Sequence, residues 1–286
     1  MAGMPETITS LDQISSRYKA IICDVWGVLH NGVTHSPDAA AALAKARDSG
    51  MPVVLVTNAP RPCDSVIAQI EAIGVPGAAW DSVVTSGDVT RDLIRQAPRR
   101  IFHLGPDRDT TLYDGLDIEL VEEFEASAVV CTGLFDDELE SPDDYVDMLR
   151  RLRARNLSFI CANPDIVVER GEKLVWCAGA LARDYALIGG RTQIAGKPHA
   201  PIYDAALKAV SELLGREVAR TEVLAIGDGM LTDIKGAADN SFDALYISGG
   251  IHAGDYGHPD QPDPARLSAF LEKHGFWPVA VMPKLS

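Results

Sequence analysis

The strongest constraint on the fold is an alternation of apolar strands with helical segments near the start of the chain. Apolar runs at 21–23, at 51–56 and from 83 onward are typical of buried strands. Helical patterns at 37–49 and 62–73 separate them, each followed by a glycine. Strands that are apolar along their whole length and joined by helices indicate a parallel sheet. We therefore predict an α/β fold with a doubly wound, Rossmann-like parallel sheet.

The same alternation returns near the end of the chain, after a middle segment with strands and helices of its own. The last part has an apolar strand at 222–226 between helical segments, then another strand at 244–248. No low-complexity linker or repeat separates the parts. We therefore predict that one core domain comprises residues 1–87 and 189–286, and that residues 88–188 form an inserted α/β domain.

Composition excludes several classes of function. The chain has 286 residues, 47% of them hydrophobic, and a formal net charge of −15, which argues against binding to nucleic acid or to an anionic membrane. It has five cysteines without a CxxC motif, so a reducing compartment is expected. It shows no secretory signal and no apolar run of about 18 residues that could span a membrane. We expect a cytoplasmic protein.

Asp24 stands out because it ends the first apolar run, where an unpaired carboxylate is costly to bury. The carboxyl end of a strand in an open parallel sheet is where ligands bind. An aspartate there can act as a nucleophile, a metal ligand or both. The alternative is an ordinary strand followed by an Asx-type turn.

Four strand ends carry polar residues in chain order: Asp24, Thr57 with Asn58, Lys197, and Asp228 with Asp233. Each alone has an ordinary explanation as a helix cap, a surface lysine or a turn. Together they suit phosphoryl transfer, which depends on positioning and charge neutralisation. Two carboxylates can bind Mg²⁺, one carboxylate can attack phosphorus, and the hydroxyl, amide and ammonium can hold phosphoryl oxygens.

The motifs around these residues resemble the haloacid dehalogenase-like (HAD) superfamily, and in particular its class IIA branch of nucleotide and sugar-phosphate phosphatases. The stretches that carry the resemblance are DVWGVLHNG (24–32), VVLVTNAP (53–60), ANPD (162–165), IAGKPHAPIY (194–203) and AIGDGMLTDIKGA (225–237). The order GKPxxxxY followed by GDxxxTD is the most specific part. The resemblance implies that the inserted segment is a class IIA cap.

The resemblance also implies the role of each site residue. Asp24 is the nucleophile, and Thr57 and Lys197 bind phosphate. From their chemistry alone, Asn58 is a further phosphate ligand through its amide or its backbone N–H, and Lys197 is also catalytic because it reduces the repulsion between Asp24 and the incoming phosphate. The magnesium ligands are Asp24, the main-chain carbonyl of Trp26, and Asp228, with Asp233 supporting them.

Trp26 is a departure from the pattern, because phosphatases of this type read DxDG and this chain reads DxWG. The second aspartate is the general acid/base, and indole has no proton that titrates near neutral pH. Three explanations stay open. A nearby polar side chain takes the role (His30, Asn31, His35 or His199), the substrate has a good leaving group, or the protein binds its ligand with little turnover.

The expected substrate is a small phosphorylated metabolite, with Trp26 and Arg170 as candidates for contacting it. Arg170 lies in the segment after ANPD that in class IIA relatives approaches the active site, although an exposed loop arginine is more often solvated. The acidic loop 136–138 is expected to be solvated. The main hypothesis is a magnesium-dependent phosphoester hydrolase, and the alternative is a low-turnover or inactive phosphometabolite-binding protein. A phospho-accepting receiver domain is disfavoured because such domains are much shorter. A homodimer is possible.

Overall fold

The structure, a computed structural model, describes residues 5–171 and 173–286 and contains two compact units. The first unit comprises the described residues up to Thr57, together with Ile67–Val84 and Tyr203–Ser286. The second comprises Asn58–Val66 and Thr85–Ile202. The domain limits predicted from the sequence, 1–87 with 189–286 and 88–188, stay a prediction.

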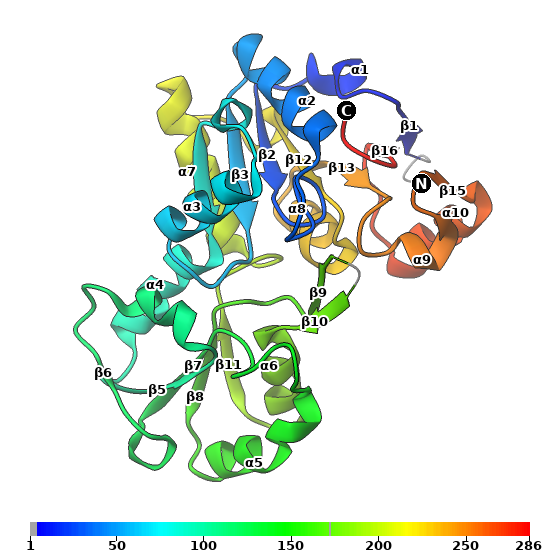
Figure 1. The fold of residues 1–286 in the computed structure, drawn as a ribbon. Helices are drawn as coiled ribbons and strands as arrows, with labels where there is room; N and C mark the ends of the chain where they lie inside the picture. The colour runs from blue at the N-terminus through cyan, green and yellow to red at the C-terminus, as the bar shows by residue number, and fades with distance from the viewer. Residues whose placement is uncertain (1–4, 172) are drawn as a thin grey trace. The chain divides into compact units, whose positions relative to one another are not determined.

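The first unit is built on a seven-stranded sheet in which each strand pair from β1 through β3 is parallel (Figure 1). In spatial order the strands are β1 (Glu6–Thr7), β16 (Ala280–Met282), β13 (Asp243–Ile247), β12 (Val223–Gly227), β2 (Ala20–Asp24), β3 (Val53–Thr57) and β4 (Ser82–Thr85). The chain runs outward from β2 in one direction and from β12 in the other. The order therefore reverses between these two central strands, and this is the position where open α/β sheets bind ligands.

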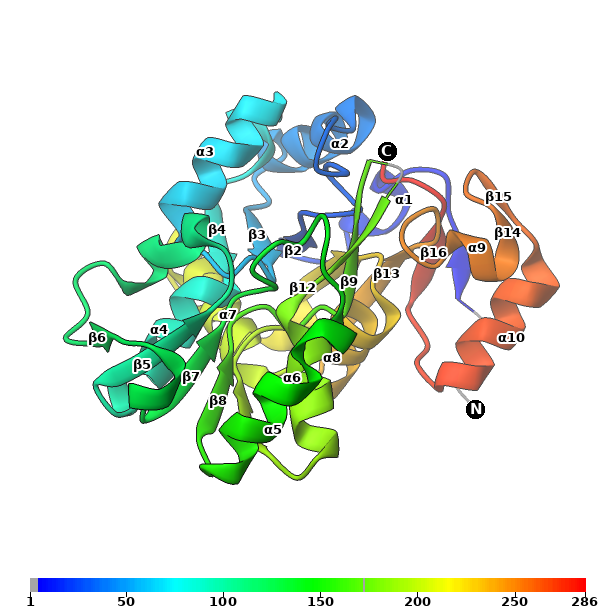
Figure 2. The same ribbon diagram turned by 60° about the horizontal axis from the view of Figure 1, so that its bottom comes forward.

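Helices cover both faces of this sheet: Figure 2 shows α2 and α3 on one side and α7 and α8 on the other. The helices are α1 (Asp12–Ser15), α2 (Pro37–Asp48), α3 (Cys63–Ile73), α7 (Ala200–Leu214), α8 (Lys235–Asp239), α9 (Ala253–Tyr256) and α10 (Pro264–His274). Short 3₁₀ turns occupy Gly77–Ala79 and Arg220–Glu222, and β14 (Gly257–His258) pairs with β15 (Gln261–Pro262). Because β2, β3 and β12 are fully buried along their lengths, their apolar sequences are explained by helices on both faces.

The second unit has its own parallel sheet, in the order β11 (Arg191–Ile194), β8 (Ser158–Cys161), β7 (Ala128–Cys131), β5 (Arg100–Leu104) and β6 (Glu119–Leu120). Successive residues of a strand point to opposite faces, so Phe159 lies in one apolar cluster and Ile160 in another. The helices are α4 (Ser86–Gln96), α5 (Val146–Ala154) and α6 (Ala178–Leu187), with 3₁₀ turns at Asp107–Tyr113, Glu123–Glu125 and Pro142–Tyr145. An antiparallel hairpin, β9 (Val167–Arg170) with β10 (Lys173–Trp176), completes the unit.

The predicted fold class is confirmed, with local differences. In the second unit, α4 begins at Ser86, because the Thr85 hydroxyl caps the helix by accepting the Asp88 N–H at 3.0 Å. The helical segment that follows β12 begins as a π-helical turn, Met230–Ile234, and continues as α8. In the part of the chain that the structure describes, no helix is long and apolar enough to cross a membrane.

Candidate active site

Three of the predicted residues come together at the carboxyl edge of the first unit's sheet. Asp24 ends β2, and Asp228 directly follows β12, whose Ile226 pairs with Cys23 of β2. Asp233 lies in the π-helical turn that follows. One carboxylate oxygen from each of the three lies within 4.8 Å of the others, and all three side chains are buried. Parallel strands whose ends meet at one edge thus gather three acidic groups from two distant parts of the sequence.

Backbone amides hold each carboxylate in place. The Val25 N–H donates to Asp24 Oδ1 at 2.7 Å, and the Ile251 N–H donates to Asp228 Oδ2 at 2.8 Å. The Gly229 N–H donates to Asp233 Oδ2 at 2.9 Å. The cluster is therefore a preorganised set of oxygen ligands.

The backbone also leaves Asp228 little room to move. Gly27 and Gly250 pack against its carboxylate so closely that a Cβ at either position would overlap it. Two ligands of one Mg²⁺ ion, at about 2.1 Å per bond, lie at most about 4 Å apart. Oxygens within 4.8 Å of one another therefore need only a small inward shift to bind one ion. The donor set fits a hard divalent cation. The participation of the Trp26 carbonyl, in the same loop as Gly27, stays a prediction.

Gly27→Ala is expected to destabilise the protein and to displace Asp228. Gly27 has φ +84°, where a side chain costs roughly 1–2 kcal/mol, and the new methyl group would also collide with the carboxylate. Gly50→Ala is the matched control, because Gly50 has φ +87° and nothing within 4 Å of the added Cβ. Urea unfolding should show the larger loss for Gly27→Ala. Equal losses would show that Asp228 is not confined as described.

Trp26 packs against the histidine that follows it in the same loop. Its ring meets the His30 ring edge-on, with centroids 4.9 Å apart and planes at 70°. His30 is buried, its Nδ1 accepts the Gly32 N–H at 2.9 Å, and burial lowers the pKa of its imidazole to about 4. With Nδ1 occupied as an acceptor, the neutral ring carries its proton on Nε2. His30 is thus a poor replacement for the missing general acid/base.

The predicted phosphate-binding residues divide between the two units. Thr57 ends β3 in the first unit, one residue beyond Val56, which pairs with Asp24. Asn58 and Lys197 belong to the second unit, where the Lys197 N–H donates to Asn58 Oδ1 at 2.8 Å. The Asn58 amide in turn donates to the Lys197 carbonyl at 3.3 Å and to Asp165 Oδ1 at 2.9 Å. The Asn58 side chain therefore fixes the backbone that carries Lys197, which is 4% exposed.

Arg170, predicted to contact substrate, is held by the acidic loop of its own unit. Its guanidinium donates to Asp137 Oδ2 at 2.8 Å and to Glu138 Oε1 at 2.9 Å, and Arg108 also pairs with Asp137. Burial raises the pKa of Asp137, but these two arginines outweigh it and hold that pKa below its usual value. The loop is thus an ion-paired anchor for β9 and not merely a solvated segment. A role of Arg170 in substrate binding stays a prediction.

The chain is similar to known proteins along most of its length. The sequence profile described as haloacid dehalogenase-like hydrolase matches residues 21–119, and a related HAD-hydrolase-like profile matches residues 194–269. A haloacid dehalogenase-like hydrolase from Brucella suis 1330 is 58% identical, with 99% of this chain and 100% of that chain covered and a TM-score of 0.89. This chain belongs to the haloacid dehalogenase-like hydrolases.

More distant members of the haloacid dehalogenase-like hydrolases include named phosphatases. Ribonucleotide monophosphatase NagD of Escherichia coli K12 is 27% identical over 244 residues, covering 82% of this chain and 88% of NagD. This match supports the NagD-like class IIA assignment. The fold is also shared with glycerol phosphate phosphatase Rv1692 of Mycobacterium tuberculosis, solved in complex with calcium. That match has 24% identity, covers 84% of this chain and 68% of that one, and has a TM-score of 0.63.

Two features of this haloacid dehalogenase-like site were missed in the sequence. The loop after β13 contributes Gly250 against Asp228 and the Ile251 N–H as a donor to it. The paired glycines that end this strand were the available signal. The second is Asp165, the last residue of the ANPD stretch, which accepts from Asn58. Its position after a strand of the second unit was the signal there.

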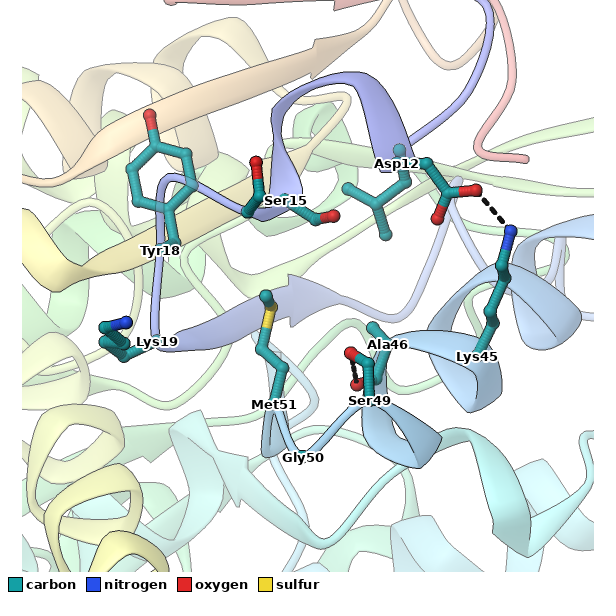
Figure 3. A pocket seen from close by; sticks show the side chains of 11 residues that line it. Asp12, Ser15, Tyr18, Lys19, Lys45, Ala46, Ser49, Gly50 and Met51 are labelled. Atoms are coloured by element: carbon teal, nitrogen blue, oxygen red, sulfur yellow. Dashed lines mark hydrogen bonds and ion pairs between the residues drawn. The ribbon is translucent and has the colours of Figure 1, made fainter.

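A separate pocket of about 430 Å³ lies at the other end of the same sheet in this hydrolase (Figure 3). Tyr18 and Lys19, just before β2, and Met51, before β3, contribute to its lining, so it adjoins the amino ends of the strands. An Asp12–Lys45 ion pair borders it. Because parallel sheets bind ligands at their carboxyl ends, we assign no catalytic part to this pocket.

Proposed function

We propose that the protein is a magnesium-dependent phosphoester hydrolase that forms an aspartyl-phosphate on Asp24. The observation that carries this proposal is the buried cluster of Asp24, Asp228 and Asp233 at the point where the strand order reverses. Membership of a family with named phosphatases supports it.

In this proposal each residue has a distinct task. An Asp24 carboxylate oxygen attacks phosphorus, while the Thr57 hydroxyl, the main-chain N–H of Asn58 and the Lys197 ammonium hold the other phosphoryl oxygens. Asp24, the Trp26 carbonyl and Asp228 would hold Mg²⁺, with Asp233 in support. The bound ion would neutralise charge on the phosphoryl group and reduce its repulsion by Asp24.

The chain further belongs, we propose, to a DxWG variant in which Trp26 replaces the usual general acid/base. The loss of such a group typically lowers the rate by about 10² to 10⁴-fold while leaving ligand binding in place. The replacement of the general acid/base by Trp26 also supports a second candidate function, a phosphometabolite-binding or regulatory protein with little turnover.

The substrate class is proposed from the relatives. NagD is named a ribonucleotide monophosphatase, and a 5′-nucleotidase, YutF of Bacillus subtilis, is 24% identical over 248 residues. By analogy with these names, the proposed substrate is a nucleotide. A sugar phosphate as the alternative substrate, and a cytoplasmic location, are proposed from the sequence.

The test is a panel of phosphorylated metabolites incubated with the protein and Mg²⁺, with released phosphate measured. The panel should include nucleotides, sugar phosphates and acyl phosphates, and substrate binding should be followed in parallel by thermal shift. The proposal predicts magnesium-dependent release from at least one compound. Binding without release from any compound would favour the second candidate function.

A further inference from the structure

We propose that the natural substrate is an acyl phosphate or a phosphoanhydride and not an alkyl phosphate ester. This inference rests on the proposed function for its Asp24 chemistry and departs from the substrate class that the names of the relatives suggest, because nucleoside monophosphates and most sugar phosphates are alkyl esters. Its basis is that Trp26 stands where the proton donor for the leaving oxygen would be, and that loop residues 25–36 contain no carboxylate. A leaving group that departs as a stable anion needs no such donor.

The position that would supply this proton is occupied by Trp26. Indole offers an N–H donor for a hydrogen bond but no proton that it can transfer near neutral pH. The side chain is half-buried and its ring is braced by His30 at 4.9 Å. Loop residues 25–36 contain no Asp or Glu, so no carboxylate of this loop can take the place of the missing aspartate.

Two of the polar side chains that follow Trp26, those of His30 and Asn31, are engaged in other contacts. His30 is 4% exposed, and its Nδ1 accepts the Gly32 N–H. The Asn31 side chain is an amide, and its Oδ1 accepts the Val33 and Thr34 N–H groups at 3.1 and 2.9 Å. The loop is therefore organised by hydrogen bonds to its own backbone.

The chemical steps balance without an acid when the leaving group is already a weak base. An Asp24 oxygen forms a bond to phosphorus, and the bond from phosphorus to the leaving oxygen breaks with its electron pair. A carboxylate or a phosphate departs as a stable anion, whereas an alkoxide would need a proton. Water then attacks phosphorus and the bond to Asp24 breaks. Asp24 leaves as a carboxylate, so this second departure also needs no acid, and the proton of the water passes to solvent.

The test measures how kcat/KM depends on the acidity of the leaving group. The probes are a series of substituted aryl phosphates of graded phenol acidity, with acetyl phosphate and glycerol phosphate at the two ends. The ratio kcat/KM is chosen because it reports the steps up to the first cleavage of a phosphorus–oxygen bond, even if breakdown of the aspartyl-phosphate limits kcat. The variants are Trp26→Asp and Trp26→Asn. The aspartate and asparagine side chains have nearly the same size, and only the carboxyl group of aspartate can transfer a proton.

The native protein should show a steep dependence, with acetyl phosphate strongly preferred over glycerol phosphate. Trp26→Asp should flatten the dependence and raise the relative rate on glycerol phosphate by about 10² to 10⁴-fold. In Trp26→Asn, the dependence of kcat/KM on leaving-group acidity should stay as steep as in the native protein. Efficient hydrolysis of glycerol phosphate by the native protein with a shallow dependence would overturn the inference, as would a steep slope in a folded Trp26→Asp variant. Failure of the proposed function itself would give a different result, because Asp24→Asn would then leave the hydrolysis of every probe unchanged or no probe would be hydrolysed at all.

Discussion

Asp24→Asn is expected to lower phosphate release by roughly 10⁴-fold or more, because the amide cannot serve as the nucleophile of the first step. The fold should persist, since the asparagine oxygen can still accept the Val25 N–H that Asp24 Oδ1 accepts at 2.7 Å. The melting temperature should not fall, because one of three crowded carboxylates loses its charge. Phosphate release and thermal unfolding, measured on the same preparation, check both parts.

Asp48→Asn is the matched control for that experiment. Asp48 is exposed in the last turn of α2, so the same chemical change there should leave activity at the native level. Activity retained by Asp24→Asn would show that the nucleophile lies elsewhere. A large loss of stability in that variant would show that Asp24 is chiefly structural.

Magnesium is expected to stabilise the native protein strongly and to be required for activity. An ion that binds only the folded state adds about 2.7 kcal/mol to the unfolding free energy when its concentration is 100 times its dissociation constant. The cluster of Asp24, Asp228 and Asp233 is the reason to expect such binding, because each carboxylate is buried and fixed by a backbone N–H. Thermal unfolding with and without added Mg²⁺, and activity after chelation and metal restoration, are the measurements.

Asp228→Asn separates this ion site from general salt effects. The variant keeps an oxygen for the Ile251 N–H but loses a charged ligand, so it should lose most of the magnesium-induced stabilisation and of the activity. Asp48→Asn should keep both. An equal magnesium shift in the native protein and in Asp228→Asn would place the ion outside the carboxylate cluster.

Much of the fold could be predicted because its signals are local. The apolar run that ends at Asp24 and the Ser36–Pro37 start of α2 each specify an element from neighbouring residues, and the structure has a strand and a helix at these places. The π-helical turn at Met230–Ile234 could not be predicted in this way. Its form follows from the Asp233 and Ile234 amides, which both donate to the Gly229 carbonyl. This shared backbone acceptor leaves no periodic pattern in the sequence.

The candidate site was predictable to the extent that it sits at strand ends. Asp24 and Asp228 follow neighbouring parallel strands, so their meeting follows from the order of the sheet. The contacts of Arg170 were not predictable, because its partners Asp137 and Glu138 lie more than thirty residues away and no spacing links them to it. The same holds for Gly250, whose closeness to Asp228 depends on how two loops pack.

The most direct test of the account is to look for the phosphoryl group on Asp24 itself. The native protein would be mixed with Mg²⁺ and acetyl phosphate, quenched in acid within the first turnovers, and analysed by peptide mass spectrometry. Because Trp26 supplies no base to activate water for the second step, the intermediate should accumulate. The account predicts a phosphoryl adduct on the peptide that contains Asp24, absent from Asp24→Asn. Phosphate release with the adduct on another residue, or with no adduct at any time in the reaction, would contradict it.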